Sequence, residues 1–206
     1  MLEKIVLPVE RIVLNSLGVN FVSMNYIDLV VANLVDDIRE DRTNFRPGLV
    51  VGIANGGTYP SIKVAKHLHV DYELIEANRN KSYFCGLNLE ERFILGRIFR
   101  PYTKTEPLLR EELRRTNLPK NVLLVDYDCG TGKTLDLVKN YLLNLKGVER
   151  VKTACLFCYE GREKADYVGE NILRLNSFMV GSKRLPWCDV SPHYGEYSKR
   201  LEESTV

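Results

Sequence analysis

The chain of 206 residues is 45% hydrophobic and 27% charged, a balance typical of a folded globular domain. Its 29 basic and 27 acidic residues give a formal net charge of +2, which does not favour nucleic acid or any other polyanion as a partner. No apolar run approaches the roughly 20 residues that span a bilayer, and the first residues lack a signal-peptide core. We therefore expect a single cytoplasmic domain with no membrane partner.

The first part of the chain alternates helical and strand patterns. Apolar residues recur at helical spacing, then form a continuous run typical of a buried strand, and the helix–strand pair then repeats. A turn with paired glycines separates the first strand from the second helix. The four elements are expected over residues 26–41, 49–54, 58–70 and 71–77.

Residues 78–120 break this alternation. The segment carries many charges, and only its part around Glu106–Thr116 has helical spacing. Connections of this length without a clear strand are uncommon in compact domains and are often functional loops. We expect a flexible loop that lies over a site.

The alternation then resumes, with a strand, a helix and two more strands ahead of the C-terminal tail. These elements are expected over Val122–Val125, Leu135–Leu145, Val151–Tyr159 and Ile172–Val180. Strands that alternate with helices predict an α/β fold with a mainly parallel twisted sheet and helices on both faces. Such sheets bind ligands at the carboxyl ends of their strands.

The five cysteines are too few and too scattered for a disulfide scaffold. Cys155 and Cys158 have the CxxC spacing of metal and redox sites, but they lie in an expected strand, where residues three apart point to opposite faces. No second CxxC or close histidine pair completes a zinc site. We interpret these cysteines as core thiols.

The stretch "VLLVDYDCGTGKT" joins an apolar strand to a helix start through glycine and threonine, where backbone N–H groups favour an anion. A nucleoside-triphosphate P-loop would need a glycine at the position of Tyr127, and a dinucleotide GxGxxG would need one at Leu135. Both alternatives are disfavoured.

The same stretch resembles the 5-phosphoribosyl-1-pyrophosphate (PRPP) motif of type I phosphoribosyltransferases. The resemblance implies that Asp126 accepts hydrogen bonds from the ribose hydroxyls and that the following turn wraps the 5-phosphate. The 5-phosphate residues would be Gly130, Thr131, Gly132, Lys133 and Thr134.

Two earlier segments agree with this family in order and spacing. The turn after the first strand is similar to the family's pyrophosphate-binding turn, which would present the N–H groups of Ala54, Asn55, Gly56 and Gly57. Ser82 and Tyr83 in "NKSYFCG" resemble the Ser-Tyr pair of the flexible catalytic loop in hypoxanthine-type members.

Two later segments resemble the purine-type members. Lys164, just before "DYVG", matches a lysine that donates to the exocyclic oxygen of a 6-oxopurine in that group. The segment "LPWCDV" is similar to the closing segment of purine salvage members. There Trp187 would stack on the base or fill the core, and Asp189 would face a magnesium ion together with Asp126.

Three positions depart from the family pattern. Tyr127 stands where the family has its second adjacent acid, and Asp128 follows one residue later. Gly130 replaces an aspartate credited with proton transfer near the purine N7, and Asn55 replaces a basic residue before the paired glycines. These departures favour the alternative of a PRPP- or nucleotide-binding regulatory protein that does not turn over.

The resemblance implies an enzyme that transfers phosphoribose from PRPP to a purine, with Mg²⁺ as cofactor. Its catalytic residues would be Asp126, Asp128, Ser82 and Tyr83. We expect one domain over residues 1–206 that assembles as a homodimer. Its parts would be a core over about 24–180, a loop over about 78–120, and a small hood from about 1–23 and 181–206.

Overall fold

The structure is a computed structural model that describes residues 20–54, 56–79, 107–109, 113–159, 165–172, 183–184, 186 and 191–205. Asn55, Ser82, Tyr83, Lys164, Trp187 and Asp189 lie outside the described residues. No helix in the described part of the chain is both long and apolar enough to cross a membrane.

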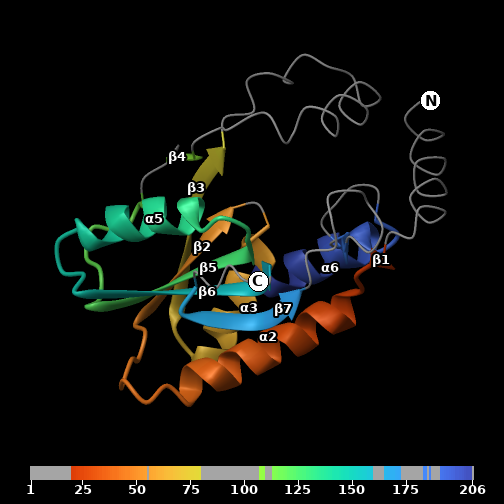
Figure 1. Cartoon of the computed structure of the whole chain (residues 1–206), viewed down its shortest axis with the longest axis horizontal. Helices are drawn as coiled ribbons and strands as arrows, with labels where there is room; N and C mark the ends of the chain where they lie inside the picture. The colour runs from red at the N-terminus through yellow and green to blue at the C-terminus, as the bar shows by residue number, and fades with distance from the viewer. Residues whose placement is uncertain are drawn as a thin grey trace.

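A six-stranded sheet forms the centre of the molecule (Figure 1). Every neighbouring pair in it is parallel except β4, which runs antiparallel to β3. The strands in spatial order are β4 (Pro107–Leu109), β3 (Asp71–Arg79), β2 (Leu49–Ala54), β5 (Asn121–Cys129), β6 (Arg150–Tyr159) and β7 (Tyr167–Ile172). This arrangement confirms the predicted α/β fold with a mainly parallel sheet.

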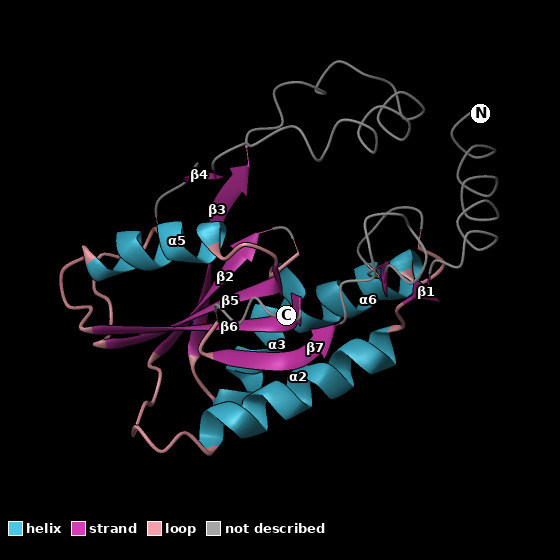
Figure 2. Cartoon of the chain, in the orientation of Figure 1, coloured by secondary structure: helices cyan, strands magenta, loops and turns pink. Residues whose placement is uncertain are grey.

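Helices cover both faces of the sheet, as predicted (Figure 2). The helices α2 (Met24–Arg39) and α3 (Thr58–Leu68) pack on one face, and α5 (Lys133–Leu143) packs on the other. The sequence determines α2 directly, because the Ser23 side chain accepts the Tyr26 N–H at its start and its apolar residues form one stripe. The buried stripe is Met24, Ile27, Val30, Val31, Leu34, Val35 and Ile38.

A second sheet consists of two short strands, one from the N-terminal part of the chain and one from the C-terminal part. Strand β1 (Asn20–Phe21) pairs in parallel with β8 (Lys183–Arg184), and both come from the segments expected to form the hood. The tail, to which the sequence assigned no helix or strand, ends in a helix, α6 (Tyr194–Thr205), which packs against α3.

Two predicted elements differ from the structure. Where Glu106–Thr116 was expected to be helical, β4 instead pairs with Ala77–Arg79 at the sheet edge, because an unpaired strand edge outweighs a weak local helical pattern. A strand was expected near Ile172–Val180, whereas β7 spans Tyr167–Ile172 and pairs with β6 from Ala154 onward; residues 173–180 lie outside the described residues.

Strand β5 is longer than its apolar run. It was expected to end at Val125, but its pairing with β6 continues to Cys129, opposite Cys158. Asp126, Tyr127 and Asp128 therefore lie within a strand and not in a turn.

Candidate active site

The two turns predicted to bind phosphate lie where the order of the strands in the sheet reverses. From β2 the chain moves outward to β3, whereas β5 leads to β6 and β7 on the other side. The pairing of β2 with β5 ends at Gly52 and Val125, after which β2 continues beside β3 and β5 continues beside β6. A reversal of this kind is the place where open α/β sheets bind ligands, at the carboxyl ends of the strands.

The β2–α3 turn is held tightly against its neighbours. The Gly57 N–H donates to the carbonyl of Ile53 at 2.9 Å, and a β-carbon on Gly57 would lie 2.5 Å from that same oxygen. This donor is therefore used within the chain, and pyrophosphate binding by the turn stays a prediction. Glycine is required at position 57 because any side chain would collide with the strand.

The β5–α5 turn is short and contains, among the described residues of this site, one with a left-handed backbone. Gly132 has φ +76° and directly precedes α5, whose first residue is Lys133. A β-carbon on Gly130, by contrast, would meet nothing within 4 Å. Gly132 is thus required by the turn, whereas Gly130 leaves open space beside it.

Both helices that start at this edge begin without a side-chain cap. Glycine occupies the N-cap of α3 (Gly57) and of α5 (Gly132), and no side-chain hydrogen bond caps either helix. Helix N-termini carry partial positive charge and favour anions. Two such termini on opposite faces of the sheet, next to adjacent strands, can receive two phosphate groups of one ligand.

Asp126 is the buried acid of this site. Its residue exposure is 7%, and its Oδ1 accepts the N–H of Tyr127 at 2.7 Å. Burial and the nearby charge of Asp128 raise the pKa of Asp126 well above its ordinary value. A buried carboxylate of this kind can accept hydrogen bonds from hydroxyl groups or contribute a ligand to a cation.

Tyr127 fills the space beside the β2–α3 turn. A β-carbon placed on Gly56 would lie 2.1 Å from Cδ1 of the Tyr127 ring, so the ring rests directly on the Gly56 backbone. The sequence marked Tyr127 only as a departure from the family motif. Nothing in its local pattern indicated a contact with residue 56.

Three thiols lie around the buried end of β5. Cys129, Cys155 and Cys158 form no disulfide in the described residues, are buried and belong to the same apolar cluster as α5. The expectation that Cys155 and Cys158 face opposite sides of the sheet is therefore wrong: Leu156 and Phe157 both pack in the other cluster, so strict alternation is lost between them. A hydrogen bond with Cys129 and burial raise the pKa of Cys155, which keeps this thiol neutral.

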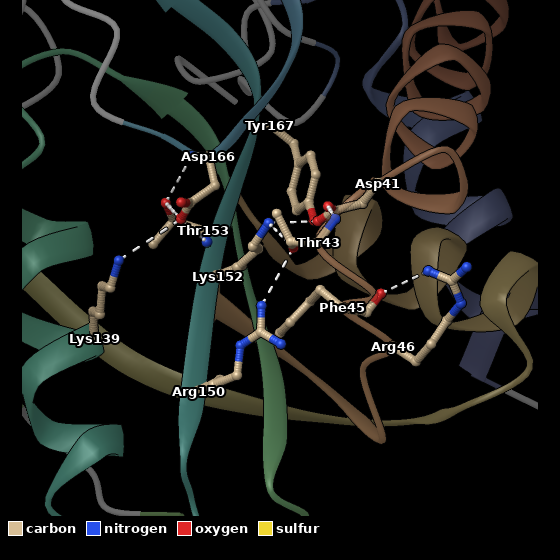
Figure 3. Close-up of polar contacts among 10 residues, drawn as sticks. All are labelled: Asp41, Thr43, Phe45, Arg46, Lys139, Arg150, Lys152, Thr153, Asp166 and Tyr167. Atoms are coloured by element: carbon tan, nitrogen blue, oxygen red, sulfur yellow. Dashed lines mark hydrogen bonds and ion pairs between the residues drawn. The ribbon is translucent and has the colours of Figure 1, made fainter.

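The "DYVG" segment, Asp166–Gly169, has structural contacts in the fold (Figure 3). Asp166 accepts the backbone N–H and the hydroxyl of Thr153 at 2.7 and 2.8 Å, and Lys139 of α5 lies 3.7 Å away. A β-carbon on Gly169 would lie 2.6 Å from Cγ1 of Val30, so glycine lets α2 cross β7 closely. These contacts anchor β7 directly after the segment that contains Lys164.

Within the described residues, the structure brings together Asp126, Asp128 and the two glycine turns. Ala54 ends β2, and Thr131 and Thr134 are half-buried beside the exposed Lys133. Asp128 lies two residues from Asp126 on the same strand, close enough for its charge to act on that carboxyl.

The chain matches the model of one known protein family over most of its length. Residues 24–181 match the family model of the phosphoribosyl transferase domain. None of the curated proteins matches the chain.

Solved structures share the fold at low sequence identity. A purine phosphoribosyltransferase from Pyrococcus horikoshii is 20% identical, with 81% of this chain and 92% of that chain covered and a TM-score of 0.58. A hypothetical protein from Neisseria gonorrhoeae with bound ppGpp is 16% identical, with 91% and 97% covered and a TM-score of 0.61. The Helicobacter pylori xanthine-guanine-hypoxanthine phosphoribosyltransferase is 15% identical, with 87% and 98% covered and a TM-score of 0.54. At these identities the likeness shows the fold alone.

The family match spans most of the chain and includes both glycine turns and the buried acid between them. The chain therefore belongs to the phosphoribosyl transferase domain family.

Proposed function

We propose that this protein transfers the 5-phosphoribosyl group of PRPP to a nitrogen of a 6-oxopurine and releases pyrophosphate. The observation that carries this proposal is the pair of glycine-capped helix starts, after Gly57 and Gly132, on either side of the buried Asp126. PRPP has a phosphate at each end of a ribose, which is the order of groups that this arrangement suits.

Each part of PRPP has a proposed partner. Asp126 accepts hydrogen bonds from the ribose hydroxyls. The turn residues 130–134 bind the 5-phosphate, through the N–H groups at the start of α5 and the threonine hydroxyls. The pyrophosphate is bound by the N–H groups of Ala54, Asn55 and Gly56, since the Gly57 N–H is used within the chain.

Mg²⁺ fits the acids at this edge of the sheet. Magnesium in phosphate-transfer sites is held by one or two carboxylates together with substrate phosphates and water. Asp126 is proposed to contribute one carboxylate from β5, and Asp189 another from the C-terminal segment. The ion supplies neutralisation of the pyrophosphate leaving group, and it would lower the pKa of Asp126 that burial has raised.

In the proposed reaction, the bond from ribose C1 to the pyrophosphate oxygen breaks and a bond from C1 to the base nitrogen forms. The transition state has oxocarbenium character, so catalysis depends on holding the leaving group and excluding water. Ser82 and Tyr83 are expected to close over the site. The carboxylate of Asp128 is proposed to accept the proton that the purine nitrogen loses.

A purine is the preferred base because of Lys164 and Trp187. Lys164 is proposed to donate to the exocyclic oxygen, and Trp187 to stack on the ring. The purine phosphoribosyltransferases from P. horikoshii and H. pylori, which share this fold, support the choice of substrate class. We also expect the chain to form a homodimer, and sedimentation equilibrium would measure the mass of the assembly.

A PRPP- or nucleotide-binding protein without turnover is the second candidate. It is favoured by Gly130, which stands where hypoxanthine-type members have an aspartate, and by the open space around it. The ppGpp-bound protein from N. gonorrhoeae is a nucleotide-bound example of the fold.

Calorimetric titration with PRPP and Mg²⁺ tests the shared part of both candidates. Saturable binding at one site per chain supports a PRPP site, and no binding contradicts both the transfer reaction and a PRPP-binding role. The variant Gly130→Asp then separates them, because the added side chain meets no atom within 4 Å of its β-carbon. An acid–base group contributes about 10²–10⁴-fold, so a rise in kcat toward that range supports an enzyme that works without this acid. Zero turnover in both proteins supports the binding function.

A further inference from the structure

The Tyr127 ring and the Gly56 backbone are in direct contact. A β-carbon on Gly56 would lie 2.1, 2.6 and 2.7 Å from Cδ1, Cε1 and Cγ of the ring. Real β-carbons do not approach other atoms so closely, so the ring occupies the volume that a side chain at residue 56 would need. Gly56 is buried, and Tyr127 is half-buried at its side.

The next residue of the turn also touches β5. A β-carbon on Gly57 would lie 3.0 Å from the carbonyl oxygen of Val125, which is the last β5 residue paired with β2. Both glycines of the β2–α3 turn therefore pack against β5, Gly57 on its backbone and Gly56 on an aromatic side chain. Beyond Val125 the strands are no longer hydrogen-bonded to each other, so Tyr127 supplies the contact that the ladder does not.

Tyr127 itself is held in place on β5. Its N–H donates to Oδ1 of Asp126 at 2.7 Å, and the residues on either side of it pair with Cys155 and Phe157 of β6. The ring thus extends from a fixed strand onto the pyrophosphate turn. The same strand leads three residues later into the 5-phosphate turn.

From these contacts we infer that Tyr127 is a positioning residue that fixes the β2–α3 turn relative to the β5–α5 turn, and so sets the spacing of the pyrophosphate and 5-phosphate subsites. This inference rests on the proposed function. The tyrosine stands where the family motif has a second ribose-binding acid, so here the position serves a packing role. The ring carbons Cδ1, Cε1 and Cγ make the contact with Gly56.

Comparison of two ligands tests the inference. Ribose 5-phosphate engages only the 5-phosphate and ribose positions, whereas PRPP engages both turns. Tyr127→Ala should weaken Mg²⁺–PRPP binding by about 10–100-fold, the cost of misplacing a positioning group, and change ribose 5-phosphate binding by less than about 2-fold. Tyr127→Phe should bind both ligands like the wild type. Tyr72→Ala, which removes a partly buried tyrosine at the other end of the sheet, is the control for general loosening.

The outcomes separate this inference from the proposed function. If the wild type binds PRPP and Tyr127→Ala binds it equally well, the inference is overturned and the function stands. Equal weakening of both ligands by Tyr127→Ala also overturns it, because the effect is then general. If the wild type binds no PRPP, the function and the inference fail together.

A double-mutant cycle checks the contact even if one variant is unstable. Gly56→Ala alone places a methyl group into the ring and should lower both Tm and PRPP affinity. The double variant Gly56→Ala with Tyr127→Ala has no ring for the methyl group to meet, so it should be more stable than Gly56→Ala alone. Its loss of stability should be smaller than the sum of the losses in the two single variants. Additive losses would mean that the ring does not rest on Gly56.

Discussion

Asp126 is a carboxyl group that the fold keeps from water and next to a second acid. Its pKa is raised by burial and by Asp128, so the folded chain holds the proton more tightly than the unfolded chain does. For an acid of this kind, stability falls as pH rises from the unfolded pKa near about 4 through the folded pKa. Such a residue costs stability at neutral pH, and a ligand or cation that interacts with its charge offsets that cost.

Replacement of Asp126 by asparagine should therefore raise stability and abolish function. Asparagine keeps the oxygen that accepts the Tyr127 N–H but carries no charge, so we expect a gain of about 1–3 kcal/mol at pH 7. The gain should shrink as the pH is lowered toward about 4. Thermal unfolding at several pH values measures it, and PRPP titration measures the loss of binding. A variant that is less stable at pH 7, or that binds PRPP normally, contradicts the role given to Asp126.

Gly132 and Gly130 form a matched pair of glycines in one turn. Gly132 has φ +76°, which costs a residue with a side chain about 1–2 kcal/mol, whereas Gly130 has no such constraint and open space around it. Gly132→Ala should lower Tm and weaken PRPP binding, and Gly130→Ala should leave Tm unchanged. Equal effects at the two positions would show that the turn differs from this structure.

At the scale of elements, a polar cluster ties the loop after α2 to β6 and β7 (Figure 3). Asp41 contacts Lys152 and the Tyr167 hydroxyl, and Lys152 also donates to Thr43 at 2.9 Å and lies over the Phe45 ring. The cluster lies at the amino ends of the strands, away from the proposed site. Its hydrogen bonds, first that from Lys152 and then that from Tyr167, hold the pKa of Asp41 well below its ordinary value.

Asp41→Asn should consequently destabilise the fold in a pH-dependent way. A depressed pKa in the folded state adds stability above the unfolded pKa, and this contribution is lost as pH falls below about 4 toward the folded pKa. We expect a lower Tm than the wild type at pH 7 and a difference that narrows in acid. Asp37→Asn, an exposed position on α2, is the control and should show no difference. A constant difference across the pH range would exclude ionisation as the cause.

Much of this element order could be predicted from the sequence. The strand at Leu49–Ala54 was predicted with its observed ends, because a continuous apolar run between polar and glycine residues has few alternatives. The extension of β5 through Asp126–Cys129 could not be predicted, since pairing with β6, a long-range interaction, overrides the acidic local sequence. For the same reason β4 was missed.

The candidate site was predictable to a different degree. The two glycine turns and Asp126 followed from motif order, and the structure brings them to one edge of the sheet. Two contacts depend on how β5 passes the β2–α3 turn: the hydrogen bond from the Gly57 N–H to Ile53, and the packing of the Tyr127 ring on Gly56. No local pattern reports such tertiary packing.

At the scale of the whole molecule, the C-terminal helix α6 contacts α2 and α3, the two helices on one face of the sheet. Arg200 of α6 donates to Asp28 at 2.5 Å and to Asn25 at 2.7 Å, both on α2. Asp28 also accepts the hydroxyl of Tyr59, whose ring meets that of Tyr197 edge-on. Tyr59 lies in the first turn of α3, so the C-terminal helix is joined to the same edge of the molecule as the proposed site.

Loss of the Arg200 hydrogen bonds should detach α6 from α2 and leave the sheet intact. Hydrogen bonds between charged groups contribute about 1.5–3 kcal/mol, so Arg200→Ala should speed amide exchange in α6 by about 10-fold or more while β2 and β5 are unchanged. Lys199→Ala, on the exposed side of the same helix, should leave exchange unaltered. Faster exchange throughout the sheet would mean that α6 is an integral part of the core.

Detection of products from PRPP, Mg²⁺ and each of hypoxanthine, guanine and xanthine is the most direct measurement for the molecule as a whole. We predict that the wild type forms a nucleoside 5′-monophosphate and one pyrophosphate per nucleotide with at least one of these bases. Asp126→Asn, folded and at least as stable, should form neither. No nucleotide from the wild type with any 6-oxopurine would contradict the proposed transfer reaction.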